Sequence, residues 1–314
     1  MAPTAAGHDT HVTYLWEDGG FAQSPSDSTA KTFGSDATLQ NFEGSNNAVR
    51  AFAPGSRQAP EIIEHTFEGS FSLQFTLTNP WWLGAVLTQP TSSTGVHTYD
   101  GGDPSSMRIQ FGNTQTSTQR ELLGCVATSC SISASTGDMV TVSIDGAYAD
   151  ESTNGTVDSQ VATTYRPMHF GHATVSRGGD TLGLVQEATL NIENNIDLIN
   201  ELGTRFAVDY SPKVREVTLD VQDIVDSEDE AERMYGQASE PAEAVTNTAD
   251  LVFEFDDGGA GGSTNTLTIN INGAIGDSYS LSGAGNPEED LTGEIAEMAP
   301  TVDAEAENDD DTAP

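Results

Sequence analysis

Apolar and polar residues alternate with a period of two over much of this chain, which is typical of half-buried β-strands. The clearest stretch follows Glu64, where alternate positions hold Phe71, Leu73, Phe75 and Leu77. Disordered chains do not alternate in this way. Similar alternation, at residues 107–111, 184–192, 217–221, 251–255 and 267–271, predicts a mainly β fold.

Turn signals separate several of these stretches. Residues 125–132 and 139–148 predict a hairpin around the turn at 135–138, while the polar residues 150–160 predict an exposed loop. After Asn79, Pro80 is tolerated in the first turn of a helix, so a short helix is expected to open there with Trp81-Trp82-Leu83.

A longer helix is predicted from 227 to 236. Ser227 and Glu230 have the spacing of a capping box, and Gly236 is a stop signal. The sequence also contains a weak internal repeat. Residues 71–84 and residues 188–203 each predict a strand, an Asn turn and a short helix that ends at Gly.

Composition divides the chain into three parts. Residues 1–60 predict an N-terminal arm that is mostly irregular and has a few short strands. Its scattered aromatic residues need a surface to pack on, such as a neighbouring subunit. Residues 61–286 contain the alternating stretches and predict a β-rich body. Residues 287–314 predict an acidic C-terminal tail, with a few ordered residues around Leu291 and Ile295.

The charge is strongly unbalanced, with 11 Lys and Arg against 49 Asp and Glu and a formal net charge of −38. A carboxylate coat of this kind repels itself at low salt. At molar salt the screening length falls to about 3 Å and the repulsion largely vanishes. The pattern resembles proteins of extreme halophiles, and it argues against tight binding of nucleic-acid phosphates.

No catalytic, cofactor-binding or metal-binding residue is assigned. The sequence lacks G-x-S-x-G, the P-loop and H-E-x-x-H, and no predicted helix follows the glycine-rich run 258–262. The pairs His8/His11 and His169/His172 have H-x-x-H spacing without the glutamate. An enzyme such as a glycoside hydrolase is therefore disfavoured, although carboxylates are abundant.

The two cysteines, Cys125 and Cys130, leave three readings open: two small half-buried residues, a disulfide across a tight loop, or half of a metal site. The first is favoured. No apolar run approaches the length of a membrane span, and residues 1–10 predict no signal peptide.

The chain resembles the tail tube proteins of tailed viruses, particularly those that infect haloarchaea. The resemblance covers roughly residues 10–236. It is carried by LVQEATLNI at 184–192, ELGTR at 201–205, PKVREVTL at 212–219, and the shorter pieces FEGSFSL at 67–73, TNPWW at 78–82, SSMRI at 105–109 and LGCVATSC at 123–130.

This resemblance implies that residues 61–286 form a β-sandwich with one flanking α-helix and extended arms and loops. An outer decoration after residue 236 is an option that the resemblance leaves open. Six copies are expected to close a ring whose inner sheets form a barrel, and the rings to stack into a hollow tube through which double-stranded DNA leaves the capsid. Implied partners are further copies of the chain, tail-tip or baseplate proteins, a terminator and a sheath. The implied location is the virion tail, assembled in the host cytoplasm.

Two other classes of protein remain open. One is a different virion component, such as a capsid decoration or baseplate protein. The other is an acidic, β-rich binding module of a cell surface, against which the missing signal peptide counts.

Overall fold

The computed structural model describes residues 10–25, 29–51, 61–93, 95–113, 118–153, 159–160, 166–225, 248–259, 265–283 and 290–307. Within these ranges the protein is mainly β, as predicted. Their helical segments are two short 3-10 turns, η2 (Trp81–Ala85) and η3 (Phe170–His172). The first confirms the short helix expected at Trp81. The helix predicted from 227 to 236 lies outside the described residues.

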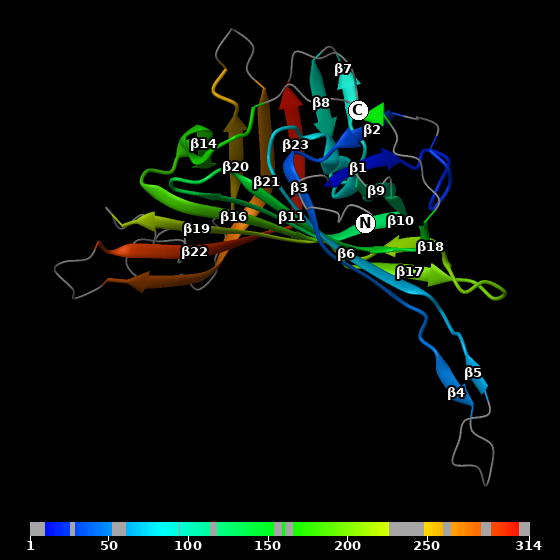
Figure 1. Cartoon of the computed structure of the whole chain (residues 1–314). Helices are drawn as coiled ribbons and strands as arrows, with labels where there is room; N and C mark the ends of the chain where they lie inside the picture. Colours follow the sequence, from blue (N-terminus) through cyan, green and yellow to red (C-terminus); the bar gives the residue numbers. More distant parts are fainter. Residues whose placement is uncertain are drawn as a thin grey trace, which may run out of the picture.

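The largest sheet, called here the long sheet, has strands from the whole length of the chain (Figure 1). All its neighbouring strands are antiparallel. In spatial order it contains β3 (Ser35–Ser45), β6 (Glu68–Thr76), β11 (Thr141–Tyr148), the second half of β10 (Thr118–Ser135), β16 (Val185–Glu193), β19 (Glu216–Ile224), β22 (Thr292–Ala299) and the second half of β21 (Thr266–Ser282).

Two further sheets share a strand with the long sheet. The N-terminal sheet contains β2 (Thr29–Thr32), β1 (Thr10–Trp16), β9 (Met107–Asn113), the first half of β10 and β12 (Asp150–Ser152); β13 (Ser159–Gln160) also pairs with β2. The C-terminal sheet contains β7 (Thr91–Ser93), β8 (Val96–Tyr99), β23 (Thr301–Glu307), the first half of β21, β20 (Ala249–Asp256), β14 (Ala173–Arg177) and β15 (Asp180–Thr181).

Glycines mark the points where the shared strands pass from one sheet to the next. In β10, Gly124 has φ +64° and lies against Phe21 and Ala149. In β21, Gly273 has φ +70°. A side chain is strained in this left-handed region, so glycine lets each strand turn without that cost.

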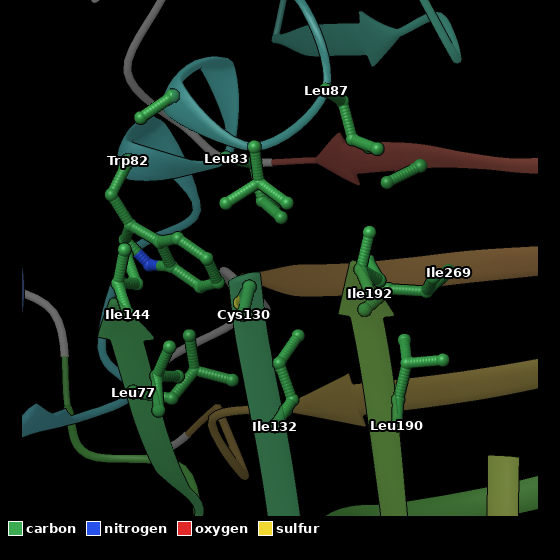
Figure 2. Close-up of a cluster of buried hydrophobic side chains, with 14 of the residues drawn as sticks. Leu77, Trp82, Leu83, Leu87, Cys130, Ile132, Ile144, Leu190, Ile192 and Ile269 are labelled. Carbon is green, nitrogen blue, oxygen red and sulfur yellow. The ribbon is translucent and has the colours of Figure 1, made fainter. Parts of the chain in front are cut away.

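The core lies between the inner face of the long sheet and the layer above it. Figure 2 shows Trp82, Leu83 and Leu87, from η2 and the residues after it, above Ile132 and Ile192 of the long sheet. All five side chains are buried. The alternation predicted for β6, β16, β19, β20 and β21 and the hairpin of β10 with β11 are confirmed, with Ile132 opposite Val142 and Phe253 opposite Ile269.

Where the structure describes them, the aromatic residues of the N-terminal arm pack within their own chain. Tyr14, Trp16 and Phe33 are buried, and Tyr14 contacts both of the other rings at centroid distances of 5.2 Å and 4.6 Å. No neighbouring subunit is needed to cover these side chains. Short strands were expected in this arm, but the 11-residue length of β3 was not, because most of its exposed positions are polar and the apolar alternation is weak.

The acidic end of the chain is more ordered than expected. Both β22 and β23 are strands with neighbours on two sides, and Val302, Ala304 and Ala306 are buried while acids occupy the alternate positions. Alanine is a weak strand signal, and the high acid content concealed the alternation. The boundaries of the arm, body and tail remain predictions.

Two local expectations were wrong. The short helix expected to end at Gly203, in the second half of the internal repeat, does not form. The chain before it forms β17 (Ile196–Asn200), which pairs with β18 (Ala207–Pro212) in a separate hairpin. The loop expected at 150–160 contains the strands β12 and β13 in its described part. Cross-strand hydrogen bonds outweigh weak local preferences at both places.

Candidate functional site

The outer face of the long sheet is a broad polar surface, called here the polar face. Its side chains alternate with the core residues along every strand, so they point away from the core. The set contains Ser70, Ser72, Gln74, Ser129, Ser131, Ser133, Thr141, Ser143, Asp145, Glu187, Thr189, Asn191, Glu193, Glu216, Thr218, Asp220, Gln222, Ser278, Ser280 and Glu294.

The register lines these residues up in rows across the sheet. One row runs from Ser143 through Ser131 and Asn191 to Thr218. The core residues run in parallel rows behind it, as from Ile144 through Cys130 and Ile192 to Val217. A single period-two pattern in each strand therefore produces both the core and the polar face.

Hydrogen bonds between strands fix parts of the polar face. Thr189 donates through Oγ1 to Ser133 Oγ at 3.0 Å, and Asn191 donates through Nδ2 to Asp220 Oδ2 at 3.0 Å. These bonds restrict the rotamers of the side chains that they join across the strands.

All the charged residues of the polar face are negative. Six of its residues are acids, and none of the strand segments that form the long sheet contains Lys or Arg. Burial raises the pKa of Asp220, the nearby Glu294 carboxylate raises it further, and the hydrogen bond from Asn191 opposes both effects. Such a surface repels phosphate groups.

Most of the described basic side chains are engaged in ion pairs elsewhere. These pairs are Arg108–Glu121, Arg120–Glu151, Arg177–Glu297, Arg205–Glu64 and Lys213–Asp197. Arg215 instead donates to the carbonyl oxygens of Gly101, at 2.9 Å, and Gly102, at 2.7 Å.

A second feature is a hairpin that extends beyond the sandwich at one end of the long sheet (Figure 1). It is called here the projecting hairpin, and it consists of β4 (Val49–Ala51) and β5 (Glu61–Ile63). Val49, Ile62 and Ile63 are all exposed on it. Apolar side chains gathered on a projection of this kind are typical of a contact surface.

Arg205 fixes the base of the projecting hairpin to the β17–β18 hairpin. Its guanidinium binds Glu64 and the side-chain oxygen of Asn46, and its carbonyl accepts a hydrogen bond from the Phe67 N–H at 2.8 Å. Phe206 adds a ring contact with Phe67 at 5.7 Å. Arg205, the last residue of the segment ELGTR at 201–205, therefore has a structural role at the base of the projecting hairpin.

The described cysteines and histidines form no recognisable reactive centre, and His8 lies outside the described residues. Cys125 and Cys130 are free thiols, as the favoured interpretation expected, but both are fully buried and not half-buried. Burial raises the pKa of both. His169 and His172 have rings 4.4 Å apart, and Nδ1 of His172 lies 2.8 Å from Asp256. Among the described residues, no group of three or more His, Cys, Asp or Glu could hold a metal ion.

Comparison with known families gives a match over nearly the whole chain. The model of the phage tail tube protein family matches residues 7–306. The chain belongs to this family. The match confirms the resemblance to tail tube proteins and extends it past residue 236, as far as residue 306 in β23. A search of curated proteins found no match.

Membership in the tail tube family supports a structural role in the tail of a virus particle, and a structural role implies a non-enzymatic protein. It also suggests self-assembly with other tail proteins. In the described part of this tail tube protein, no helix is long and apolar enough to cross a membrane.

Sequence reasoning did not identify the polar face of this tail tube protein. The polar positions within each strand were visible, but the order of the strands was not. Pairing of β22 with β19, and of β6 with β11, joins segments about 70 residues apart onto one surface. The absence of Lys and Arg from all these segments was the available signal.

Proposed function

We propose that this protein is the tail tube subunit of a tailed virus, polymerised as stacked hexameric rings around a lumen lined by the polar face. The observation that carries the proposal is the polar face itself: a broad, hydrogen-bonded surface with carboxylates and without a basic residue. DNA phosphates are repelled by such a lining, so the genome slides through without binding.

Ring closure follows from the free edges of the long sheet. Its outermost strands are β3 on one side and the second half of β21 on the other. Within the described residues, neither has a partner on its outer edge in that sheet. An unpaired strand edge can form backbone hydrogen bonds with a strand of another chain. If β3 of each copy pairs with β21 of the next, the repeated contact closes a ring.

The remaining parts of the proposal follow from the tube. The partners are further copies of the chain, the tail tip or baseplate, a terminator and a sheath, and the DNA passes through transiently. The subunit is assembled in the host cytoplasm. The carboxylate coat suits molar salt, so the proposed virus infects a halophilic archaeon.

The lumen is tested by adding a positive charge at the centre of the polar face. Ser131→Lys is expected to leave ring formation intact and to slow DNA release from virus particles, because a ring of lysines attracts phosphates. Thr268→Lys is the matched control, since Thr268 lies on the C-terminal sheet opposite Glu254 and Glu305. Equal DNA release by both variants would count against a lumen at the polar face.

A further inference from the structure

The dipeptide Asn272-Gly273 lies in β21, where this strand passes from the C-terminal sheet to the long sheet. Gly273 has φ +70°, so the backbone at this position favours glycine strongly over other residues. The side chain of Asn272 is held by a neighbouring strand, because its Nδ2 donates to Asp303 Oδ2 of β23 at 2.8 Å. The fold therefore places an asparagine directly before a glycine in a strand that two sheets share.

An Asn-Gly pair is chemically unstable in water, and asparagine is accordingly among the thermolabile residues. The peptide nitrogen of the glycine attacks Cγ of the asparagine side chain, so that a C–N bond forms. The side-chain amide leaves as ammonia and takes the proton of the peptide N–H with it. Water then opens the cyclic imide to aspartate or isoaspartate. Glycine favours this reaction because it has no side chain to hinder the attack.

Deamidation of Asn272 would damage β21 at the point on which both sheets depend. Isoaspartate carries the main chain through the former side chain, which lengthens the backbone and disrupts the register with β20 and β23. A new carboxylate would also stand where the amide now lies, 2.8 Å from Asp303. Two carboxylates this close repel each other. The integrity of this dipeptide therefore matters to the whole sandwich.

Asp250 holds the nitrogen that would attack. The register between β20 and β21 shifts between Ala249 and Leu251, so that Asn272 and Gly273 together oppose the single residue Asp250. Such a bulge disrupts the regular ladder of backbone hydrogen bonds. The N–H of Gly273 instead donates to Asp250 Oδ1 at 2.9 Å. Because this nitrogen must lose its proton during the attack, a negatively charged acceptor on the N–H opposes the first step.

Asp303 holds the side chain that would be attacked. Its Oδ1 accepts from Asn270 Nδ2 at 2.7 Å, and its Oδ2 accepts from Asn272 Nδ2 at 2.8 Å. The carboxylate is therefore fixed by two bonds, and it keeps the Asn272 amide beside β23. Since β21 lies between β23 and β20, the amide and the Gly273 N–H are bound toward opposite neighbours. Cyclisation has to break both bonds.

We propose that Asn272-Gly273 is a deamidation site that Asp250 and Asp303 keep closed, by binding its nucleophile and its side-chain amide to opposite neighbouring strands. Both aspartates are positioning residues, because they act only on the groups of β21 that would react. Loss of either one removes one of the two restraints. The inference concerns the folded subunit and does not rest on the proposed tube.

The test incubates the folded protein in mildly alkaline buffer at molar salt and measures the mass increase of the peptide that contains Asn272. Asp250→Ala and Asp303→Ala should each deamidate at least about tenfold faster than the wild type, because each loses a hydrogen bond to a charged group. Glu254→Ala is the matched control and should keep the wild-type rate. This exposed acid lies on β20 opposite Thr268, away from the site.

Two further variants separate this role from a general loss of stability. Val175→Ala removes buried methyl groups from the same sheet, so it should lower the melting temperature without faster deamidation of Asn272. Asp250→Asn keeps an acceptor oxygen but not the charge, and it should give an intermediate rate. A second Asn-Gly pair, Asn154-Gly155, lies outside the described residues and is the internal reference. Its rate should be the same in every variant.

A wild-type rate of deamidation at Asn272 in either alanine variant would overturn the inference. So would an acceleration in Val175→Ala equal to that in Asp250→Ala, because the aspartates would then act only through stability. If the alanine variants do not fold, a wild-type rate in Asp250→Asn would overturn it in the same way. None of these results bears on the tube proposal, since the measurement does not depend on assembly.

Discussion

Arg177 Nε donates to Glu297 Oε1 at 3.0 Å, across the core, from β14 of the C-terminal sheet to β22 of the long sheet. The two residues are 120 positions apart in the chain, and the Glu297 side chain is fully buried. The pair therefore ties together two sheets that are otherwise joined through apolar contacts and the shared strand β21.

Glu297→Gln is expected to destabilise the subunit strongly. Breaking a buried pair leaves the other charge uncompensated, at a cost of about 3–5 kcal/mol. Thermal unfolding in molar salt measures the loss. Glu294→Gln, on the exposed side of the same strand, is the matched control and should change stability by less than about 0.5 kcal/mol. Equal melting temperatures of the two variants would show that the pair does not matter.

Arg215 is a second link between distant segments. It donates through Nε to Asn194 Oδ1 at 2.7 Å, in addition to the carbonyls of Gly101 and Gly102. Lysine cannot reproduce this fork, so Arg215→Lys should cost about 1–3 kcal/mol of unfolding free energy. Urea titration is the measurement. Lys213→Arg, at an exposed ion pair two residues earlier, should be nearly neutral.

Neighbouring positions of β16 provide a direct test of the two faces of the long sheet. Leu190 is fully buried opposite Ile132 and Leu219, so Leu190→Asp should abolish soluble folding. Thr189→Asp, one residue earlier on the polar face, should fold and assemble. Solubility and circular dichroism report the outcome. A soluble, assembling Leu190→Asp variant would refute this assignment of faces.

The contrast between Leu190 and Thr189 also shows what the sequence could predict. Strong alternation fixed the core face of β6, β16 and β19 because apolar burial decides strand orientation. The full length of β3 and the strand β23 were missed, since serine, aspartate and alanine carry little strand preference. The polar face was missed because it depends on long-range pairing, which no local pattern encodes.

Glu17 predicts a pH dependence of stability. Burial raises the pKa of its carboxyl above the ordinary 4.5, although the Gly124 N–H, the Ser106 side chain, the Ala22 N–H and Arg108 oppose the shift. The folded state then holds its proton more tightly than the unfolded state. This residue's contribution to stability should therefore fall as the pH rises from 4.5 through the raised pKa.

Glu17→Gln isolates this effect from the other carboxylates. The melting temperature of the wild type minus that of the variant should decrease as the pH rises through this window. Calorimetry at a series of pH values measures the difference. A difference that is constant, or that increases with pH, would contradict the raised pKa.

Salt is expected to control assembly through the carboxylate coat. Dilution from molar salt to about 0.1 M lengthens the screening distance from about 3 Å to about 10 Å. Repulsion between subunits should then loosen tubes and rings, as light scattering would record. Tubes that persist unchanged at low salt would refute the halophilic adaptation.

The most direct test of the central claim is a cryo-electron microscopy reconstruction of the purified protein assembled in molar salt. The account predicts stacked six-fold rings, with the row of Ser143, Ser131 and Asn191 facing the lumen. Tubes with this row on the outer surface, or a protein that stays monomeric even on a tail-tip seed, would contradict it.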